Sequence, residues 1–95
     1  MSKLEENRAV IDRVDQELTK LFEERFKAVL EIAEYKKENG MEIFDSSREE
    51  AIIAKHTGNV PEEFRPYFRS WYMEMLKLSK EYQKEKIGRD EAPEK

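Results

Sequence analysis

Residues 4–39 read LEENRAVIDRVDQELTKLFEERFKAVLEIAEYKKEN and contain neither glycine nor proline. Apolar side chains recur there at the three- and four-residue spacing of one helix face. These positions are Leu4, Ile11, Val14, Leu18, Leu21, Ala28, Ile32 and Tyr35. Gly40 predicts the end of this helix, because glycine readily adopts the left-handed conformation found after a helix C-terminus.

A helix of about 36 residues is roughly 54 Å long at 1.5 Å per residue. So long a helix cannot bury its apolar face within one small chain, and the sequence therefore predicts a partner helix from a second copy. The composition agrees, because 95 residues with 38% hydrophobic and 42% charged content form one domain with a thin core.

The charge and the residue types exclude several function classes. The net charge is −4 and both signs are interspersed, which argues against a nucleic-acid-binding protein with its basic surface. The chain has no cysteine, so disulfides, thiol chemistry and zinc–thiolate sites are excluded. It also has no long apolar run, so neither a signal peptide nor a transmembrane helix is expected, and a cytoplasmic protein is predicted.

A second helix is predicted to start at residues 45–47, Asp-Ser-Ser, whose side-chain oxygens can cap free backbone amides. Ser46 and Glu49 have the spacing of a capping box. This helix is expected to be short, to about Lys55, with a loop at residues 56–59.

A third helix is predicted after Pro61, which suits a first helical turn, with an irregular start or a restart near Arg65 because Pro66 follows. Gly88 predicts its end. Its apolar positions, which we expect to be core, are Phe64, Phe68, Trp71, Met75, Leu78 and Tyr82. The other methionines are expected to be core as well.

The predicted fold is all-α, with three helices (long, short, long) in residues 1–87. The second and third helices fold back along the first, and two chains form an intertwined homodimeric helical bundle. We expect residues 1–3 to fray and residues 88–95 to be a disordered charged tail.

One residue breaks the apolar face of the first helix. Arg25 stands where leucine or isoleucine is expected, and a buried unpaired guanidinium costs several kcal/mol, so it should meet an anion. That anion is either a glutamate of a neighbouring helix or a ligand. Lys36 lies on nearly the same face, roughly 16 Å further along the axis, whereas Arg8 lies about 100° away. Arg8 is therefore not expected to serve the same site within one subunit.

Other polar residues interrupt apolar faces or stand at helix starts. The full set is Arg8, Arg25, Lys36, Asp45, Arg48, Glu49, Ser79 and Gln83. Several cations with one acid and one amide suit a small ligand that carries two carboxylates and a hydroxyl. Each residue also has a simpler interpretation: a solvated surface residue for Arg8 and Lys36, a helix cap for Asp45 and Glu49, and a helix-flank polar residue for Ser79 and Gln83.

These residues occur in a recognisable order. The chain carries Arg8-x-x-Ile11-Asp12-x-x-Asp15, Glu24-Arg25, Tyr35-Lys36, Asp45-x-x-Arg48-Glu49 and Ser79-x-x-x-Gln83. The ordered set resembles the all-helical bacterial family of chorismate mutases over roughly residues 4–87. The resemblance implies the rearrangement of chorismate to prephenate, in the biosynthesis of phenylalanine and tyrosine through the shikimate pathway. It also implies an isomerase that is a homodimer with two equivalent active sites and needs no metal or cofactor.

The resemblance further implies a role for each residue. Arg25 and Arg48 match the residues that hold the substrate carboxylates, and Arg8 matches an arginine donated by the partner chain. Lys36 and Gln83 match the two donors to the ether oxygen.

Glu49 matches the acceptor for the ring hydroxyl, and Asp45 and Ser79 match supporting positions at the pocket wall. Three rival interpretations stay open. They are a lyase of the same fold that eliminates pyruvate from isochorismate, a regulatory or docking domain for a partner enzyme of aromatic biosynthesis, and a structural helical dimer without a ligand. The Asp45-x-x-Arg48-Glu49 stretch favours the mutase over the lyase.

Overall fold

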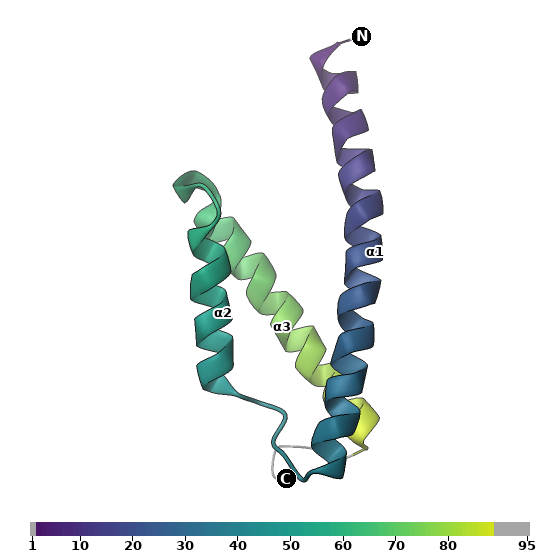
Figure 1. The fold of residues 1–95 in the computed structure, drawn as a ribbon. Coiled ribbons are helices and arrows are strands. Elements are labelled where there is room, and N and C mark those ends of the chain that lie inside the picture. Colours follow the sequence, from purple (N-terminus) through teal and green to yellow (C-terminus); the bar gives the residue numbers. More distant parts are fainter. Residues whose placement is uncertain (1, 89–95) are drawn as a thin grey trace.

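The computed structural model describes residues 2–88, and all the secondary-structure elements in this part of the chain are helices (Figure 1). The elements in order are α1 (Lys3–Glu38), α2 (Ser46–Gly58), the short 3₁₀ helix η1 (Glu62–Phe64) and α3 (Arg65–Ile87). The predicted order of a long, a short and a long helix is confirmed. No helix within residues 2–88 has both the length and the apolar character needed to cross a membrane.

α3 packs against both α1 and α2. It crosses between α1 and α2, and the N-terminal half of α1 projects beyond it (Figure 1). The prediction that the later helices fold back along α1 is confirmed for α3. α2 also runs back in the direction opposite to α1, but it packs against α3 (Figure 1).

Local signals define both ends of α1. Ser2 caps the helix: its Oγ accepts from the Glu5 amide at 3.1 Å, and the Glu5 carboxylate accepts from the Ser2 amide at 3.1 Å. This reciprocal capping holds the first turn. The prediction that residues 1–3 fray is therefore wrong for Ser2 and Lys3, and Met1 lies outside the described residues. At the other end Gly40 has φ +64°, the left-handed turn predicted there.

The C-terminal end of α2 differs from the prediction. The helix continues past Lys55 to Gly58, so His56 is helical and does not begin a loop. The reason lies in a later segment, because the Arg65 guanidinium donates to the carbonyl of Val60 at 2.8 Å and to that of Gly58 at 3.3 Å. Carbonyls at a helix end need such partners, and Arg65 supplies them from the start of α3.

The N-terminal end of α2 is capped by Asp45, whose Oδ1 accepts from the Arg48 amide at 3.1 Å. The predicted helix start is confirmed. The capping box between Ser46 and Glu49 is wrong, because the Glu49 carboxylate pairs with Lys80 of α3.

The start and the end of α3 follow the prediction. Pro61 precedes η1, and Pro66 stands in the first turn of the helix that restarts at Arg65. Gly88 ends α3 with φ +79°. Residues 89–95, predicted to be a disordered charged tail, lie outside the described residues.

The buried face of α3 is rotated from the predicted one. Its buried residues are Tyr72, Leu76, Ser79, Gln83 and Ile87. Phe64, Trp71 and Leu78 are exposed, and Trp71 keeps 53% of its surface accessible. Phe68, Met75 and Tyr82 are half-buried. The prediction that Trp71 is core is wrong within one chain, because α3 turns a face toward α2 as well as toward α1.

The methionine prediction is also wrong in part, since Met41 and Met73 are exposed and Met75 is half-buried. The described core consists of two small clusters. One joins Ala33, Ile43 and Ile87, and the other joins Ile52, Tyr72 and Leu76. The predicted apolar face of α1 stays largely uncovered. Its exposed members are Leu4, Ile11, Val14, Leu18, Leu21, Ile32 and Tyr35.

Candidate active site

Arg25 and Ser79 meet where α1 packs against α3. Nη1 of Arg25 donates to Oγ of Ser79 at 3.0 Å, and Ser79 is only 4% exposed. None of the ion pairs within residues 2–88 involves Arg25. Of the two alternatives for its anion, a glutamate of a neighbouring helix is therefore not found within the described part of the chain. A guanidinium has five N–H donors, so most of them are left for an anion that enters from outside.

Lys36 lies near the end of α1, where the chain turns toward α2. Its Nζ donates to the carbonyl oxygen of Ile43 at 2.8 Å in a partly buried contact. Ile43 itself belongs to a core cluster. Lys36 is thus held against the connector, in contrast to its exposed neighbour Lys37, and it keeps further ammonium donors free for a ligand.

Gln83 stands one turn after Ser79 on the buried face of α3 and is 8% exposed. Its Oε1 is buried and has no hydrogen-bond partner within residues 2–88. A buried amide oxygen without a partner costs about 1–3 kcal/mol. A 180° turn of the amide exchanges its oxygen and its NH₂ group, so the same position can donate to a ligand.

The first turn of α2 supplies three of the predicted residues. Asp45 caps the helix through the Arg48 amide, and the Arg48 side chain is exposed. Glu49 is half-buried and forms an ion pair with Lys80, with 3.1 Å between Nζ and Oε2. Asp45 and the Arg48 amide therefore also define the start of α2, and Glu49 also attaches α2 to α3.

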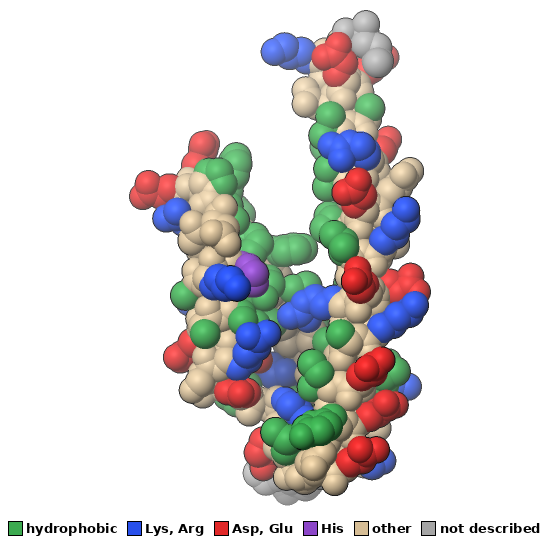
Figure 2. Space-filling model, viewed as in Figure 1, with side chains coloured by type: hydrophobic (Ala, Val, Ile, Leu, Met, Phe, Trp, Pro, Cys, Tyr) green, Lys and Arg blue, Asp and Glu red, His purple; other side chains and the backbone are tan. Residues whose placement is uncertain are grey.

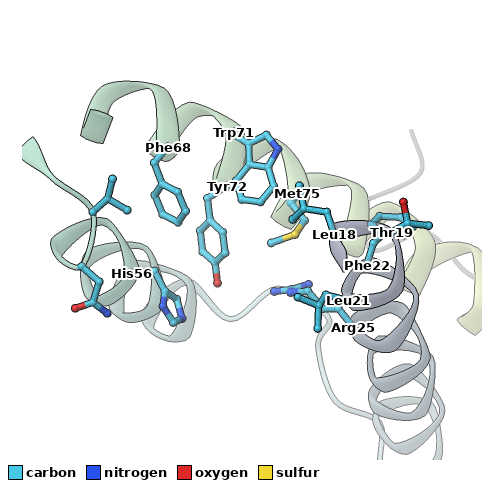
Figure 3. A pocket seen from close by; sticks show the side chains of 12 residues that line it. Leu18, Thr19, Leu21, Phe22, Arg25, His56, Phe68, Trp71, Tyr72 and Met75 are labelled. Carbon is cyan, nitrogen blue, oxygen red and sulfur yellow. The ribbon is translucent and has the colours of Figure 1, made fainter. Parts of the chain in front are cut away.

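A cavity of about 790 Å³ opens between α1 and the pair formed by α2 and α3. Figure 3 shows Arg25 reaching from α1 toward the wall formed by His56 and Tyr72. Most of the lining is apolar, including Leu18, Phe22, Phe68, Trp71 and Met75. Figure 2 shows hydrophobic side chains along the hollow between the two arms of the molecule. Of the predicted site residues, only Arg25 lines this cleft, which therefore sets one cation in a mostly apolar wall.

The chorismate mutase type II family model matches residues 7–84. The chain belongs to the type II chorismate mutase family. It is accordingly a chorismate mutase, an isomerase, as the ordered motifs predicted. The matched range contains every predicted site residue, from Arg8 to Gln83. Neither the search of curated proteins nor the search of solved structures returned a match.

Within one chain of this chorismate mutase, Arg8 lies far from Arg25. Arg8 is in the exposed N-terminal half of α1, about 25 Å along the axis from Arg25 at 1.5 Å per residue. Within one chain the helix geometry therefore keeps Arg8 apart from Arg25, Ser79 and Gln83.

Sequence reasoning missed two residues that lie near the candidate residues. His56 lines the cavity and packs edge-on against the Tyr72 ring, with 5.6 Å between the ring centroids. Its signal was the four-residue spacing from Ile52 on one helix face. Lys80 pairs with Glu49 across 31 residues of sequence. No local pattern could have identified that pair.

Proposed function

We propose that this chain catalyses the rearrangement of chorismate to prephenate as a homodimer, by preorganising the substrate and stabilising charge in the transition state. The observation that carries the proposal is the junction of α1 and α3. There Arg25 is fixed by Ser79, and Gln83 is buried one turn further along α3. The family match supports the same reaction.

The chemistry explains why such a set suffices. The reaction is unimolecular: the ether C–O bond breaks as a new C–C bond forms within the same molecule, so no nucleophile is required. The protein has to hold the flexible enolpyruvyl arm over the ring, which lowers the entropy cost of reaching the reactive conformation. It also has to place hydrogen-bond donors where negative charge develops on the ether oxygen.

Cationic residues take the first task. Arg25 and Arg48 bind the two substrate carboxylates, because a guanidinium matches a carboxylate with two parallel N–H donors. Arg8 of the partner chain assists them. Lys36 and Gln83 take the second task by donating to the ether oxygen. The partly buried position of Lys36 and the burial of Gln83 support preorganisation of these donors.

The remaining residues orient the substrate or its contacts. Glu49 accepts a hydrogen bond from the ring hydroxyl. Ser79 holds the Arg25 guanidinium, and Asp45 caps the helix that carries Arg48 and Glu49. Ser79 and Asp45 thus act through the residues they support.

The homodimer is part of the proposal. The apolar face of α1 is exposed from Leu4 to Leu21, and the cavity walls include the exposed Trp71. Burial of one helix face against the same surface of a second copy would cover both features. It would also bring Arg8 of one chain toward the site of the other. We place the reaction in aromatic amino acid biosynthesis in the cytoplasm.

The first experiment follows chorismate consumption by ultraviolet absorbance with the purified protein and identifies the product. We expect rapid loss of chorismate with prephenate as the product. Isochorismate is supplied in parallel, because release of pyruvate from it would indicate the lyase. No loss of chorismate by a folded helical dimer would overturn the proposed reaction.

A further inference from the structure

Lys80 follows Ser79 on α3 and reaches across to α2. Its Nζ lies 3.1 Å from Oε2 and 3.3 Å from Oε1 of Glu49, so the ammonium contacts both carboxylate oxygens. The two side chains are 28% and 21% exposed. The ion pairs along α1 are different, since Arg13 and Glu17 are 64% and 66% exposed.

The same ammonium has a second contact at the start of α2. It lies over the Phe44 ring, 4.5 Å from the centroid. Phe44 directly precedes Asp45, the N-cap of α2. A cation over an aromatic face is favourable, and more so when it is partly desolvated. Lys80 therefore contacts both sides of the Asp45-x-x-Arg48-Glu49 stretch and fixes its place relative to α3.

The ion pair leaves Glu49 able to bind a ligand. An ionised carboxylate offers about four lone-pair sites, and one ammonium near both oxygens uses about two of them. The remaining sites are left for a second hydrogen-bond donor. Glu49 is also in the first turn of α2, where the helix dipole favours negative charge. An anchored, ionised carboxylate with free acceptor sites is what a hydroxyl group requires.

We propose that Lys80 is a positioning residue for Glu49. The ammonium holds the carboxylate in one orientation, so that its free lone pairs meet the ring hydroxyl of the substrate. This inference rests on the proposed function, in which Glu49 recognises that hydroxyl. Lys80 itself acts through Glu49 and makes no contact with the substrate.

The test measures kcat and KM for chorismate. In Lys80→Met, which keeps the aliphatic stem but loses the charge, kcat/KM is expected to fall about tenfold, the scale of coupling between contacting residues. Lys80→Arg should retain most of the activity, because it restores a cation beside Glu49. Lys77→Met is the matched control, since Lys77 is an exposed lysine less than one turn away on α3. It should leave kcat/KM unchanged.

A double-mutant cycle separates positioning from mere stabilisation. In a Glu49→Gln background, Lys80→Met should cause no further loss of kcat/KM, because the group through which Lys80 acts is already neutral. A structural ion pair would lower the unfolding midpoint and leave kcat/KM of the folded protein intact. Where Lys80→Met does not fold, Lys80→Gln takes its place.

The outcomes are distinct. Wild-type kcat/KM in Lys80→Met, or an equal loss in both backgrounds, would overturn this inference alone. An inactive wild-type protein would overturn the proposed function and this inference together. The positioning role is supported if kcat/KM falls in Lys80→Met, stays near wild type in Lys80→Arg, and falls no further when Lys80→Met is added to Glu49→Gln.

Discussion

Arg25 shows how one neighbour changes the meaning of a residue. Its position on an apolar face predicts an anionic partner, yet its contact within the chain is the neutral hydroxyl of Ser79. A hydroxyl orients the guanidinium without neutralising it. The positive charge therefore remains for a carboxylate ligand, and the hydroxyl that orients the guanidinium is buried.

Removal of either central cation should abolish most of the activity. We expect Lys36→Ala and Arg25→Ala each to lower kcat/KM by about 10²–10³-fold, as for the loss of one preorganised donor. Lys37→Ala is the control, because Lys37 adjoins Lys36 but is exposed. Steady-state kinetics and circular dichroism would check activity and folding. Wild-type turnover in both folded variants would contradict the assignment of the site.

Gln83 predicts a change in pH dependence. An amide donates a hydrogen bond at any pH, whereas a carboxylic acid donates only while it is protonated. An exposed glutamate has a pKa of about 4.3, and burial raises it. Gln83→Glu should therefore be most active in acid and lose activity as the pH rises through that pKa, while the wild type keeps its activity at neutral pH. Parallel pH profiles for the two proteins would refute the role of Gln83.

At the scale of elements, the two ends of α2 are stabilised by contacts of different range. Its start is local, because Asp45 caps it from within the same turn. Its end is tertiary, because Arg65 satisfies the Gly58 carbonyl from the next helical segment. The helix that carries Arg48 and Glu49 is thus set in place by residues on either side of it.

Two glycines at helix ends should respond oppositely to alanine. Gly40 has φ +64°, where an alanine costs about 1–2 kcal/mol, and open space around it leaves no other effect. Gly58 is helical with equally open surroundings, so alanine should stabilise by about 0.4–1 kcal/mol through the unfolded state. Urea unfolding at one protein concentration measures both. Shifts of the same sign would contradict this account.

For the whole molecule, the main feature is the apolar face of α1, which a single chain leaves exposed. Leu4, Ile11 and Leu21 are each more than half exposed on it. Apolar side chains in such a row favour association with a second helix. The same helix carries Arg8 far from Arg25, and in the homodimer we propose the second copy supplies Arg8 to the site and covers this surface.

Subunit complementation tests the shared site. Arg8→Ala and Arg25→Ala should each be nearly inactive as homodimers. In a mixed dimer, one site combines the intact Arg25 of one chain with the intact Arg8 of the other. Refolding an equal mixture should then restore about a quarter of wild-type activity, since half of the dimers are mixed and each has one intact site. A mixture no more active than its parents would show that Arg8 is not donated across a dimer interface.

Much of the fold and of the candidate residue set follows from the sequence. Helix periodicity and the stops at Gly40 and Gly88 are local, so the three helices could be predicted. The motif order identified the family for the same reason, because the spacing of residues along the chain can be read without knowing how the helices pack. The placement of Arg25 beside Ser79, 54 residues later, depended on how α1 meets α3.

Only the tertiary structure decided which helix faces are buried and which partners the polar groups find. Trp71 was predicted to be core, but α3 packs with two helices at once and turns Tyr72 inward in its place. Lys80 and Glu49 pair across helices, so neither residue's neighbours in sequence reveal the contact. Hydrogen-bond and dihedral preferences act within a few residues and fix the helices. Burial and charge pairing act between distant segments, and they determine which candidate residues contact each other.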